Sequence, residues 1–217
     1  LDTWIKYHNI KKNNTKCISF ESNGVIIPEK LYDESNKNLY LSLTDDDLKN
    51  KKIETKIIES NNQVFIFPQS RDWDLLFQNL GIDIKTTHFA AELISFLSKL
   101  ANTSLKKSVF IHLRKNFFDV FIYQGSQLLL FNSFPHQDED EFLYYLFFVL
   151  EQFYLKANQF KAIFLGKFLE YQSYYDAFKQ FHLITDFTYP ENLEIDSNHP
   201  APFFNYFNAY ENNIRKV

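Results

Sequence analysis

The polar turn Arg114-Lys115-Asn116 is the part of the sequence best suited to binding an anion. It follows the apolar run 108–113 and precedes a second apolar run that begins at Phe117. Two cationic side chains and one amide at a turn can donate several hydrogen bonds to a phosphate or carboxylate. The same residues also suit an ordinary solvent-exposed hairpin turn, and on residue types alone we favour that second interpretation.

Two acidic clusters could supply hard oxygen ligands to a divalent cation. They lie at residues 138–141 and at residues 45–47. The first cluster directly precedes a long apolar run, and acids in the first turn of a helix satisfy its free N–H groups and its dipole. We therefore expect a helix start at 138–141 and a capped or solvated loop at 45–47, rather than metal sites.

The other reactive side chains show no catalytic spacing. Cys17 has no histidine close to it in the sequence, and Ser133 lies outside any Gly-x-Ser-x-Gly motif. The histidines form neither an HxH nor an HExxH pattern and are expected to be surface or hydrogen-bonded core residues. They are His8, His88, His112, His136, His182 and His199. We predict no catalytic residue and no metal site.

The elements that position these side chains are clearest in residues 108–166. Runs of β-branched and aromatic residues at 108–113, 117–123 and 127–134 are separated by polar turns, which predicts an antiparallel meander. Both faces of the middle run carry apolar residues, so helices are expected on both faces of the sheet. A fourth strand is predicted to end at Gly166.

A long helix is predicted between the third and fourth strands. Apolar residues run without interruption from Phe142 to Leu150 and recur at Phe153 and Leu155. Because several faces of this helix are apolar, it is either buried or a contact surface. The run is about half the roughly 20 apolar residues that a membrane span needs, so no membrane insertion is expected.

The rest of the chain is predicted to complete two similar halves. The expected elements are strands at 17–21, 25–27, 53–58, 63–67, 82–87 and 183–188 and helices at 29–33, 71–79, 89–101 and 169–181. Residues 39–43 fit either a helical turn or a strand. The polar break at 102–104 predicts a boundary, which gives domains at 1–104 and 105–217.

Composition excludes several classes of protein. Apolar residues make up 45% and aromatic residues 18% of the chain, which is ample for a core and argues against disorder. The net charge of −4 leaves no basic footprint for nucleic acid. A single cysteine excludes an intramolecular disulfide. We expect a cytoplasmic protein.

Residues 108–134 resemble an uncharacterised Bacteroidetes family, the domain of unknown function 3822, which has an actin-like ATPase fold. The resemblance continues in order through 142–152 and 163–166, and upstream through 25–34 and 85–88. More distantly, the chain is similar to actin-like scaffolds of pilus and secretion machines. The resemblance implies an α/β protein of two ribonuclease-H-like halves, with mixed sheets and helices on both faces. It also implies that the first strands of the first half are missing here.

The resemblance locates where a nucleotide would bind. Actin-like ATPases hold phosphates with an Asp-x-Gly turn between the first two strands of each half, and adenosine on a double-glycine turn. In the second half the phosphate turn falls at 112–116, which contains neither Asp nor Gly. The adenosine turn has Gly166 followed by Lys167, which is one glycine rather than two. Because the glycine that admits phosphate and the acid that organises Mg²⁺ are absent there, ATP hydrolysis is not expected. The candidate anion or nucleotide positions are Arg114, Lys115, Asn116 and Gly166.

Three functions remain open on the sequence. The leading prediction is a non-catalytic scaffold that binds an unidentified protein, because the core is intact while the phosphate turns are eroded. The alternative is a nucleotide-binding switch that binds ATP and Mg²⁺ with little or no hydrolysis. An enzyme of unrelated chemistry is the third, and no residue indicates it.

Overall fold

The computed structural model describes residues 16–20, 24–42, 48–79, 85–101, 106–157, 159–182 and 185–188. The chain divides into two compact units, Leu1–Glu92 and Leu93–Val217. The division falls inside helix α4 (Phe89–Ala101). The polar break at 102–104 lies outside the described residues.

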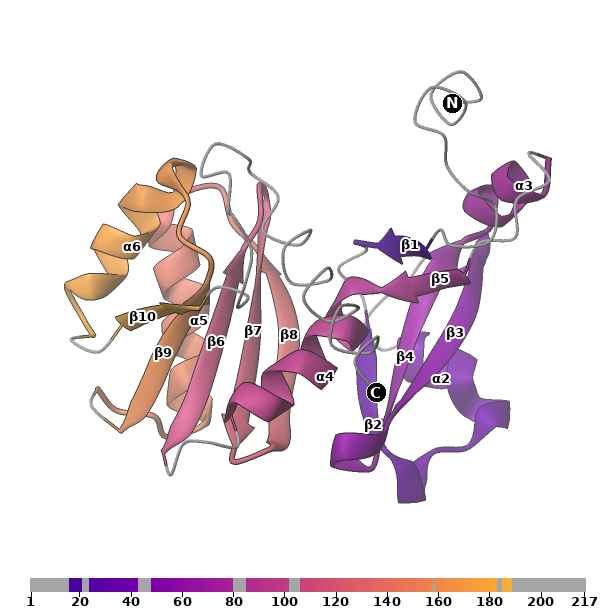
Figure 1. Cartoon of the computed structure of the whole chain (residues 1–217), viewed down its shortest axis with the longest axis horizontal. Coiled ribbons are helices and arrows are strands. Elements are labelled where there is room, and N and C mark those ends of the chain that lie inside the picture. The colour runs from indigo at the N-terminus through magenta and orange to yellow at the C-terminus, as the bar shows by residue number, and fades with distance from the viewer. Residues whose placement is uncertain are drawn as a thin grey trace, which may run out of the picture. The chain divides into compact units, whose positions relative to one another are not determined.

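The described part of the second unit is built on a five-stranded mixed sheet. Strands β6, β7 and β8 form an antiparallel meander, β9 runs parallel to β6, and β10 runs parallel to β9 (Figure 1). The spatial order is β10-β9-β6-β7-β8. The strands are β6 (Lys107–Leu113), β7 (Phe117–Gln124), β8 (Gln127–Pro135), β9 (Phe160–Leu165) and β10 (Thr185–Thr188). A meander followed by two parallel strands is the ribonuclease-H-like order, so the predicted fold class is confirmed.

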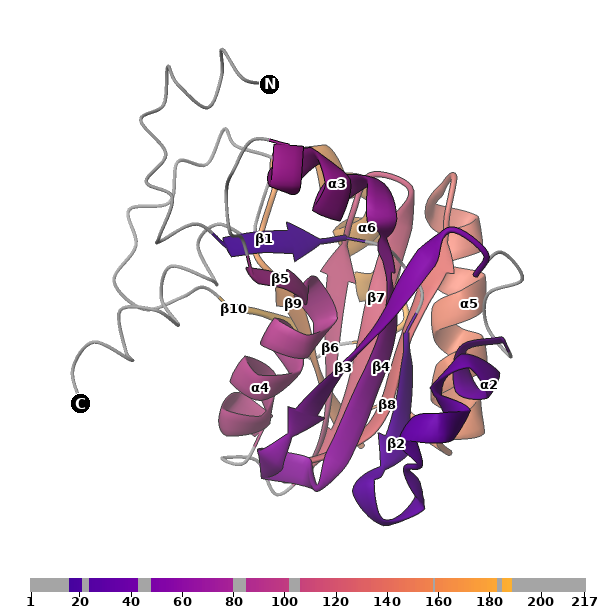
Figure 2. The same ribbon diagram turned by 90° about the vertical axis from the view of Figure 1, so that its right-hand side faces the viewer.

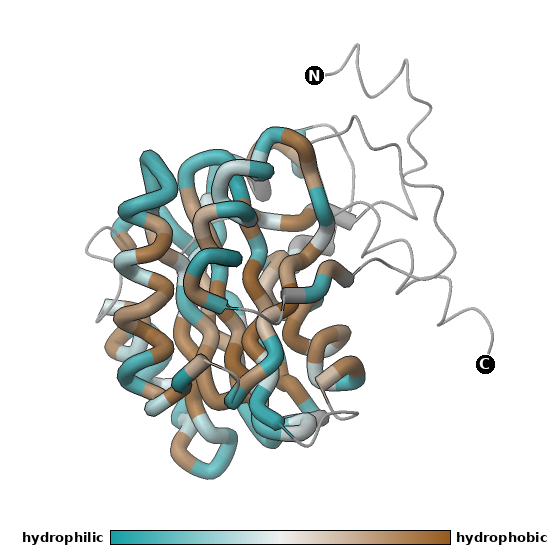
Figure 3. The backbone as a smooth tube through the Cα atoms, turned by 90° about the vertical axis from the view of Figure 1, so that its left-hand side faces the viewer, coloured by the Kyte–Doolittle hydropathy of each residue, from teal (hydrophilic) through white to brown (hydrophobic). Residues whose placement is uncertain are grey.

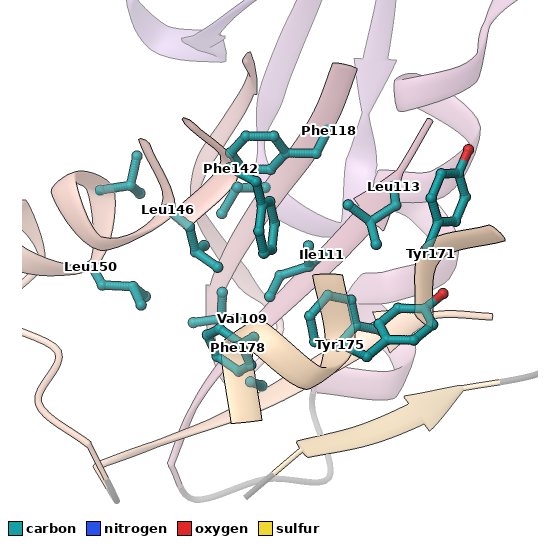
Figure 4. Packing of buried hydrophobic residues seen from close by; sticks show 14 of the residues in the cluster. Val109, Ile111, Leu113, Phe118, Phe142, Leu146, Leu150, Tyr171, Tyr175 and Phe178 are labelled. Carbon is teal, nitrogen blue, oxygen red and sulfur yellow. The ribbon is translucent and has the colours of Figure 1, made fainter. Parts of the chain in front are cut away.

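Helices α5 (Glu139–Gln152) and α6 (Gln172–Lys179) lie together on one face of this sheet (Figure 1). Val109 and Ile111 of β6 point toward Phe142 of α5 and Phe178 of α6 in a single apolar core (Figure 4). The tube of Figure 3 shows hydrophobic residues along many of the strands and hydrophilic ones at many turns. Because successive side chains of a strand point to opposite faces, every second apolar residue of β6 and β7 contributes to the surface onto which both helices pack.

The opposite face of the same sheet is also covered. Phe110, Phe121 and Tyr123 point to this face and are fully buried. The hydroxyl group of Tyr123 donates a hydrogen bond of 3.0 Å to the carbonyl oxygen of Ile94 in α4. Helices therefore lie on both faces of the sheet, as the two apolar faces of the middle strand predict.

The start of α5 explains the acidic cluster at 138–141. The Asp138 carboxylate accepts a hydrogen bond of 2.9 Å from the Glu141 N–H, and the Glu141 carboxylate accepts one of 2.9 Å from the Gln137 N–H. The arrangement is similar to a capping box, except that the Glu141 side chain accepts from the residue before the N-cap. The predicted helix start at these acids is confirmed.

The described residues of the first unit form two small sheets (Figure 2). Strands β3 (Lys51–Ile58) and β4 (Gln63–Ser70), both predicted as strands, form an antiparallel hairpin, and β2 (Val25–Pro28) pairs with the other edge of β4. The second sheet joins β1 (Lys16–Ser19) to β5 (Lys85–His88) in parallel.

The helices of the first unit follow local signals in its sequence. The ambiguous residues 39–43 fall largely within helix α2 (Lys37–Ser42), which places Leu41 in a small core with Val64 and Ile66. Helix α3 (Arg71–Asn79) follows β4 directly. A short 3-10 helix, Glu29–Leu31, replaces the longer helix expected at 29–33.

Candidate functional site

The turn between β6 and β7 is held closed by His136. The N–H of Arg114 donates to the Phe117 carbonyl at 2.8 Å, and the N–H of His136 donates to the Asn116 carbonyl at 3.1 Å. The Nε2 atom of His136 lies 2.9 Å from the Arg114 carbonyl oxygen and 3.2 Å from that of Phe117, so this nitrogen carries a proton and donates. The carbonyl groups of Arg114, Asn116 and Phe117 are therefore engaged within the second unit.

The three candidate side chains of this turn lie in different environments. The guanidinium of Arg114 folds back and makes a bidentate contact with Asp119, from Nε at 2.9 Å and from Nη2 at 2.8 Å. Its side chain is only 13% exposed. Lys115 and Asn116 are exposed at the tip of the turn. Arg114 is thus committed to an internal ion pair, whereas Lys115 and Asn116 face solvent.

Asp119 is the centre of a buried polar cluster that is not evident from the sequence. Its carboxylate also accepts a hydrogen bond of 2.5 Å from the Ser133 hydroxyl and lies 2.7 Å from Nδ1 of His112. His112, Asp119 and Ser133 are cross-strand neighbours on β6, β7 and β8, on the face opposite the α5 and α6 core. The one sign of this cluster in the sequence is Asp119 itself, an acid in the middle of an apolar strand.

The charges of this cluster balance when His112 is neutral. Burial alone would raise the pKa of Asp119, but the hydrogen bond from His112 and the positive charge of Arg114 outweigh it and lower that pKa. Burial lowers the pKa of His112, and it outweighs the attraction of the Asp119 carboxylate. The guanidinium already neutralises the carboxylate, so a proton on His112 would add an uncompensated buried charge. The cluster is therefore one anion, one cation and a neutral imidazole.

This arrangement holds the Ser133 hydroxyl without activating it. The acceptor of the serine proton is the Asp119 carboxylate. A carboxylate whose pKa is lowered is a weak base and does not generate a serine nucleophile. That Ser133 has no catalytic role stays a prediction.

The Gly166 turn follows β9 and is packed against an aromatic ring. Gly166 has a φ of +81°, and a Cβ atom placed there would lie 2.3 Å from the ring of Phe168. The hydroxyl group of Tyr175 accepts from the Phe168 N–H at 3.2 Å and donates to the Gly166 carbonyl at 3.4 Å. Glycine is therefore required here by the backbone conformation and by the adjacent ring.

A row of aromatic contacts connects the two turns. Both turns follow the carboxyl ends of adjacent parallel strands, because Ile111 of β6 pairs with Phe164 of β9. Ring centroids are 6.5 Å apart for Phe168–Tyr171, 6.2 Å for Tyr171–Tyr174 and 5.0 Å for Tyr174–His136. His136 then contacts the Arg114 carbonyl. The structure brings the candidate turns to one edge of the sheet and links them through aromatic side chains.

The remaining candidates give no further site among the described residues. No group of three His, Cys, Asp or Glu side chains in that part of the chain is placed to hold a metal ion. Residues 45–47, His8 and His199 lie outside it, and of Cys17 only the backbone, in β1, is described. The four described histidines, His88, His112, His136 and His182, are all buried. No helix within the described ranges is long and apolar enough to cross a membrane.

Comparison with known proteins places the chain in a family. The sequence model of a family described as "Protein of unknown function (DUF3822)" matches residues 13–183. A similar solved structure is a protein from Bacteroides thetaiotaomicron VPI-5482 with an actin-like ATPase fold and unknown function, with a TM-score of 0.72 and 21% identity. The match covers 79% of this chain and 66% of that one, so the chain spans just under two thirds of that protein's length.

A second solved structure, the AlfA filament bound to AMPPNP, is more distant. It has a TM-score of 0.43 and 9% identity, and the match covers all of this chain and 65% of that one. No protein of curated function matches the chain in sequence. The first structural likeness agrees with the ribonuclease-H-like strand order of the second unit. The chain has an actin-like ATPase fold and belongs to the DUF3822 family.

Proposed function

We propose that this chain is a non-catalytic protein-interaction scaffold whose nucleotide-binding turns are degenerate. The observation that carries the proposal is the state of the two turns in the second unit. The Arg114 guanidinium is bound to Asp119, and the Phe168 ring covers Gly166. Groups that would contact phosphate and adenosine in an actin-like ATPase are here used for internal packing.

The residues at these turns fit a magnesium nucleotide poorly. A nucleotide-binding glycine leaves room for a ligand, but the room beside Gly166 is taken by a ring 2.3 Å from the Cβ position. A carboxylate that organises Mg²⁺ and water must be accessible, whereas Asp119 is fully buried and engaged by Arg114, His112 and Ser133. We propose no resident cofactor and no step that depends on one.

An interaction role is supported by apolar side chains that the second unit leaves exposed. Tyr144 and Phe148 on α5 are 67% and 52% exposed, and Phe181 after α6 is 56% exposed. Phe181 packs edge-on against Phe147 of α5, so its exposed side chain extends the α5 surface. Exposed apolar side chains that cluster in this way commonly mark interaction sites. The proposed partner is a cytoplasmic protein.

The nucleotide part of the proposal is tested by thermal unfolding with millimolar Mg-ATP, Mg-ADP or Mg-GTP. A ligand at 100 times its dissociation constant would add about 2.7 kcal/mol, which is roughly 5 to 11 °C for a chain of this size. We expect no shift with any of the three and no release of inorganic phosphate from ATP. A clear shift without phosphate release would instead support the nucleotide-binding switch.

If a shift occurs, two variants locate its origin. Lys115→Ala and Asn116→Ala change exposed side chains of the candidate turn, so they should abolish a shift that arises there. Lys156→Ala, which changes an exposed lysine outside that turn, is the matched control. The interaction part of the proposal is tested by purifying the chain from its native cells and looking for retained proteins. A clean monomer with no retained protein would contradict it.

A further inference from the structure

We propose that the outer face of α5 docks a partner helix that presents two apolar side chains between two basic ones. The outer face of α5 is defined by Asp140, Tyr144, Phe148 and Glu151, all exposed. The inference rests on the proposed interaction function and names the chemistry of the partner.

The four residues form one continuous stripe. At about 100° per residue they fall within an arc of roughly 80°, and Asp140 and Glu151 lie about 16 Å apart along the axis. Tyr144 and Phe148 lie between them. The order along the stripe is acid, aromatic, aromatic, acid. An exposed apolar pair of this kind suits packing against a second helix, because side chains one turn apart form a ridge that fits between the side chains of the facing helix.

Tyr144, one of the two aromatic residues of the stripe, is supported from within the second unit. Tyr144 makes an edge-on contact with Tyr145 at 5.2 Å, and the Tyr145 ring stacks on Phe134 of β8 at 5.5 Å. Beside the stripe, Phe147 is held between Phe178 and Phe181. Aromatic anchors that are already positioned lose little conformational entropy on binding, which is typical of interaction hot spots.

The charge of α5 identifies the partner as basic. The helix carries Glu139, Asp140, Glu141 and Glu151 and no lysine or arginine.

A second copy of this chain is a poor occupant of the same face. An antiparallel pair of α5 helices would place Asp140 against Glu151 of the other copy, and a parallel pair would place each acid against itself. Like charges set opposite one another oppose association, whereas a partner with bases at both ends complements the stripe.

The spacing of the stripe sets the spacing in the partner. An antiparallel helix that pairs both acids needs basic residues about 11 positions apart, with apolar residues about 3 and 7 positions after the first base. The probe is therefore a synthetic helical peptide with lysines and leucines at these positions and alanine or glutamine elsewhere. A second peptide with glutamate in place of both lysines is its control.

Binding of the labelled lysine peptide to the full chain is measured by fluorescence anisotropy at low and high salt. We expect binding that weakens with salt, and at least a tenfold loss with Phe148→Ser or Tyr144→Ser. Glu151→Lys should also weaken it, while the glutamate peptide should not bind. Leu169→Ser, which removes an apolar side chain that is 80% exposed and lies outside α5, should leave binding unchanged. Circular dichroism and thermal unfolding check that each variant is folded.

Several outcomes would overturn the inference. Absence of binding by the folded chain is one, and equal binding of the two peptides or of the Phe148→Ser variant is another. Dimerisation in sedimentation experiments that Phe148→Ser abolishes would assign the face to a second copy. These failures are distinct from failure of the proposed function. A chain that retains a protein partner but ignores the peptide has the interaction role without this site, and a nucleotide-induced shift would contradict the proposed function without affecting peptide binding.

Discussion

Replacing Asp119 with asparagine should lower the free energy of unfolding by about 3 to 5 kcal/mol. The Asp119 carboxylate is fully buried and is contacted by Arg114 at 2.8 and 2.9 Å, by His112 at 2.7 Å and by Ser133 at 2.5 Å. Asparagine keeps the shape but removes the negative charge. The substitution removes the counter-ion of the Arg114 guanidinium, whose side chain is only 13% exposed. The new amide NH₂ group also faces side chains that are themselves hydrogen-bond donors.

The effect is large enough to measure simply. At about 2 to 4 °C per kcal/mol for a chain of this length, the melting temperature should fall by roughly 6 to 20 °C. Urea titration followed by circular dichroism gives the free energy directly. The matched control is Asp176→Asn, an exposed acid that lies 3.8 Å from Lys179, where a loss below about 1 kcal/mol is expected.

A double variant tests whether the lost stability comes from the Arg114 guanidinium that has no counter-ion. Adding Arg114→Met to Asp119→Asn removes the uncompensated guanidinium, so the double variant should be more stable than Asp119→Asn alone. The reasoning is refuted if Asp119→Asn costs no more than Asp176→Asn. It is also refuted if Arg114→Met lowers the free energy of unfolding of the Asp119→Asn variant as much as it lowers that of the unchanged chain. The two side chains would then not be coupled.

Three further predictions concern separate features of the second unit. Burial holds the pKa of His112 below its ordinary value, so the unfolded chain binds a proton that the folded chain does not. Stability should therefore fall below about pH 6.5 by up to about 1.4 kcal/mol per pH unit, and His112→Gln should flatten that slope in urea titrations. Gly166→Ala should cost about 1 to 3 kcal/mol because φ is +81° and the Phe168 ring blocks the Cβ, and a Phe168→Ala background should reduce the cost measured by the same titrations. Asp138→Ala removes the N-cap of α5 and should cost about 1 kcal/mol, seen as a lower melting temperature, whereas an unchanged value would contradict the capping role.

Elements whose limits depend on neighbouring residues were predictable. The bounds of α3 and α4 agree with the sequence analysis residue for residue, and the meander of β6, β7 and β8 agrees within one residue at each end. Caps, glycines and polar turns act over a few residues, so their effects can be read locally. The helix expected at 169–181 shows the limit of this, because it is divided into a 3-10 turn, Leu169–Tyr171, and α6.

Pairing between distant strands was not predictable in the same way. Strands β1 and β2 are neighbours in sequence, yet β1 pairs with β5 and β2 pairs with β4. Strand propensity says that a segment is extended but does not name its partner, which depends on the packing of the whole sheet. The sequence of residues 39–43 fits either a helix or a strand because distant residues select between them. The helix is selected by the burial of Leu41 against Val64 and Ile66 of β4.

The sequence by itself determined the order of the elements, the two-sided sheet of the second unit and the position of both candidate turns, because these follow from short-range patterns of apolar and turn-forming residues. Only the tertiary structure decided what the turn residues do. Arg114 faces inward because the register of β6, β7 and β8 brings Asp119, His112 and Ser133 together. Gly166 is covered because Tyr175 of α6 holds the Phe168 backbone beside it. A side chain's role depends on which distant groups share its environment, and that is fixed only when the strands and helices pack.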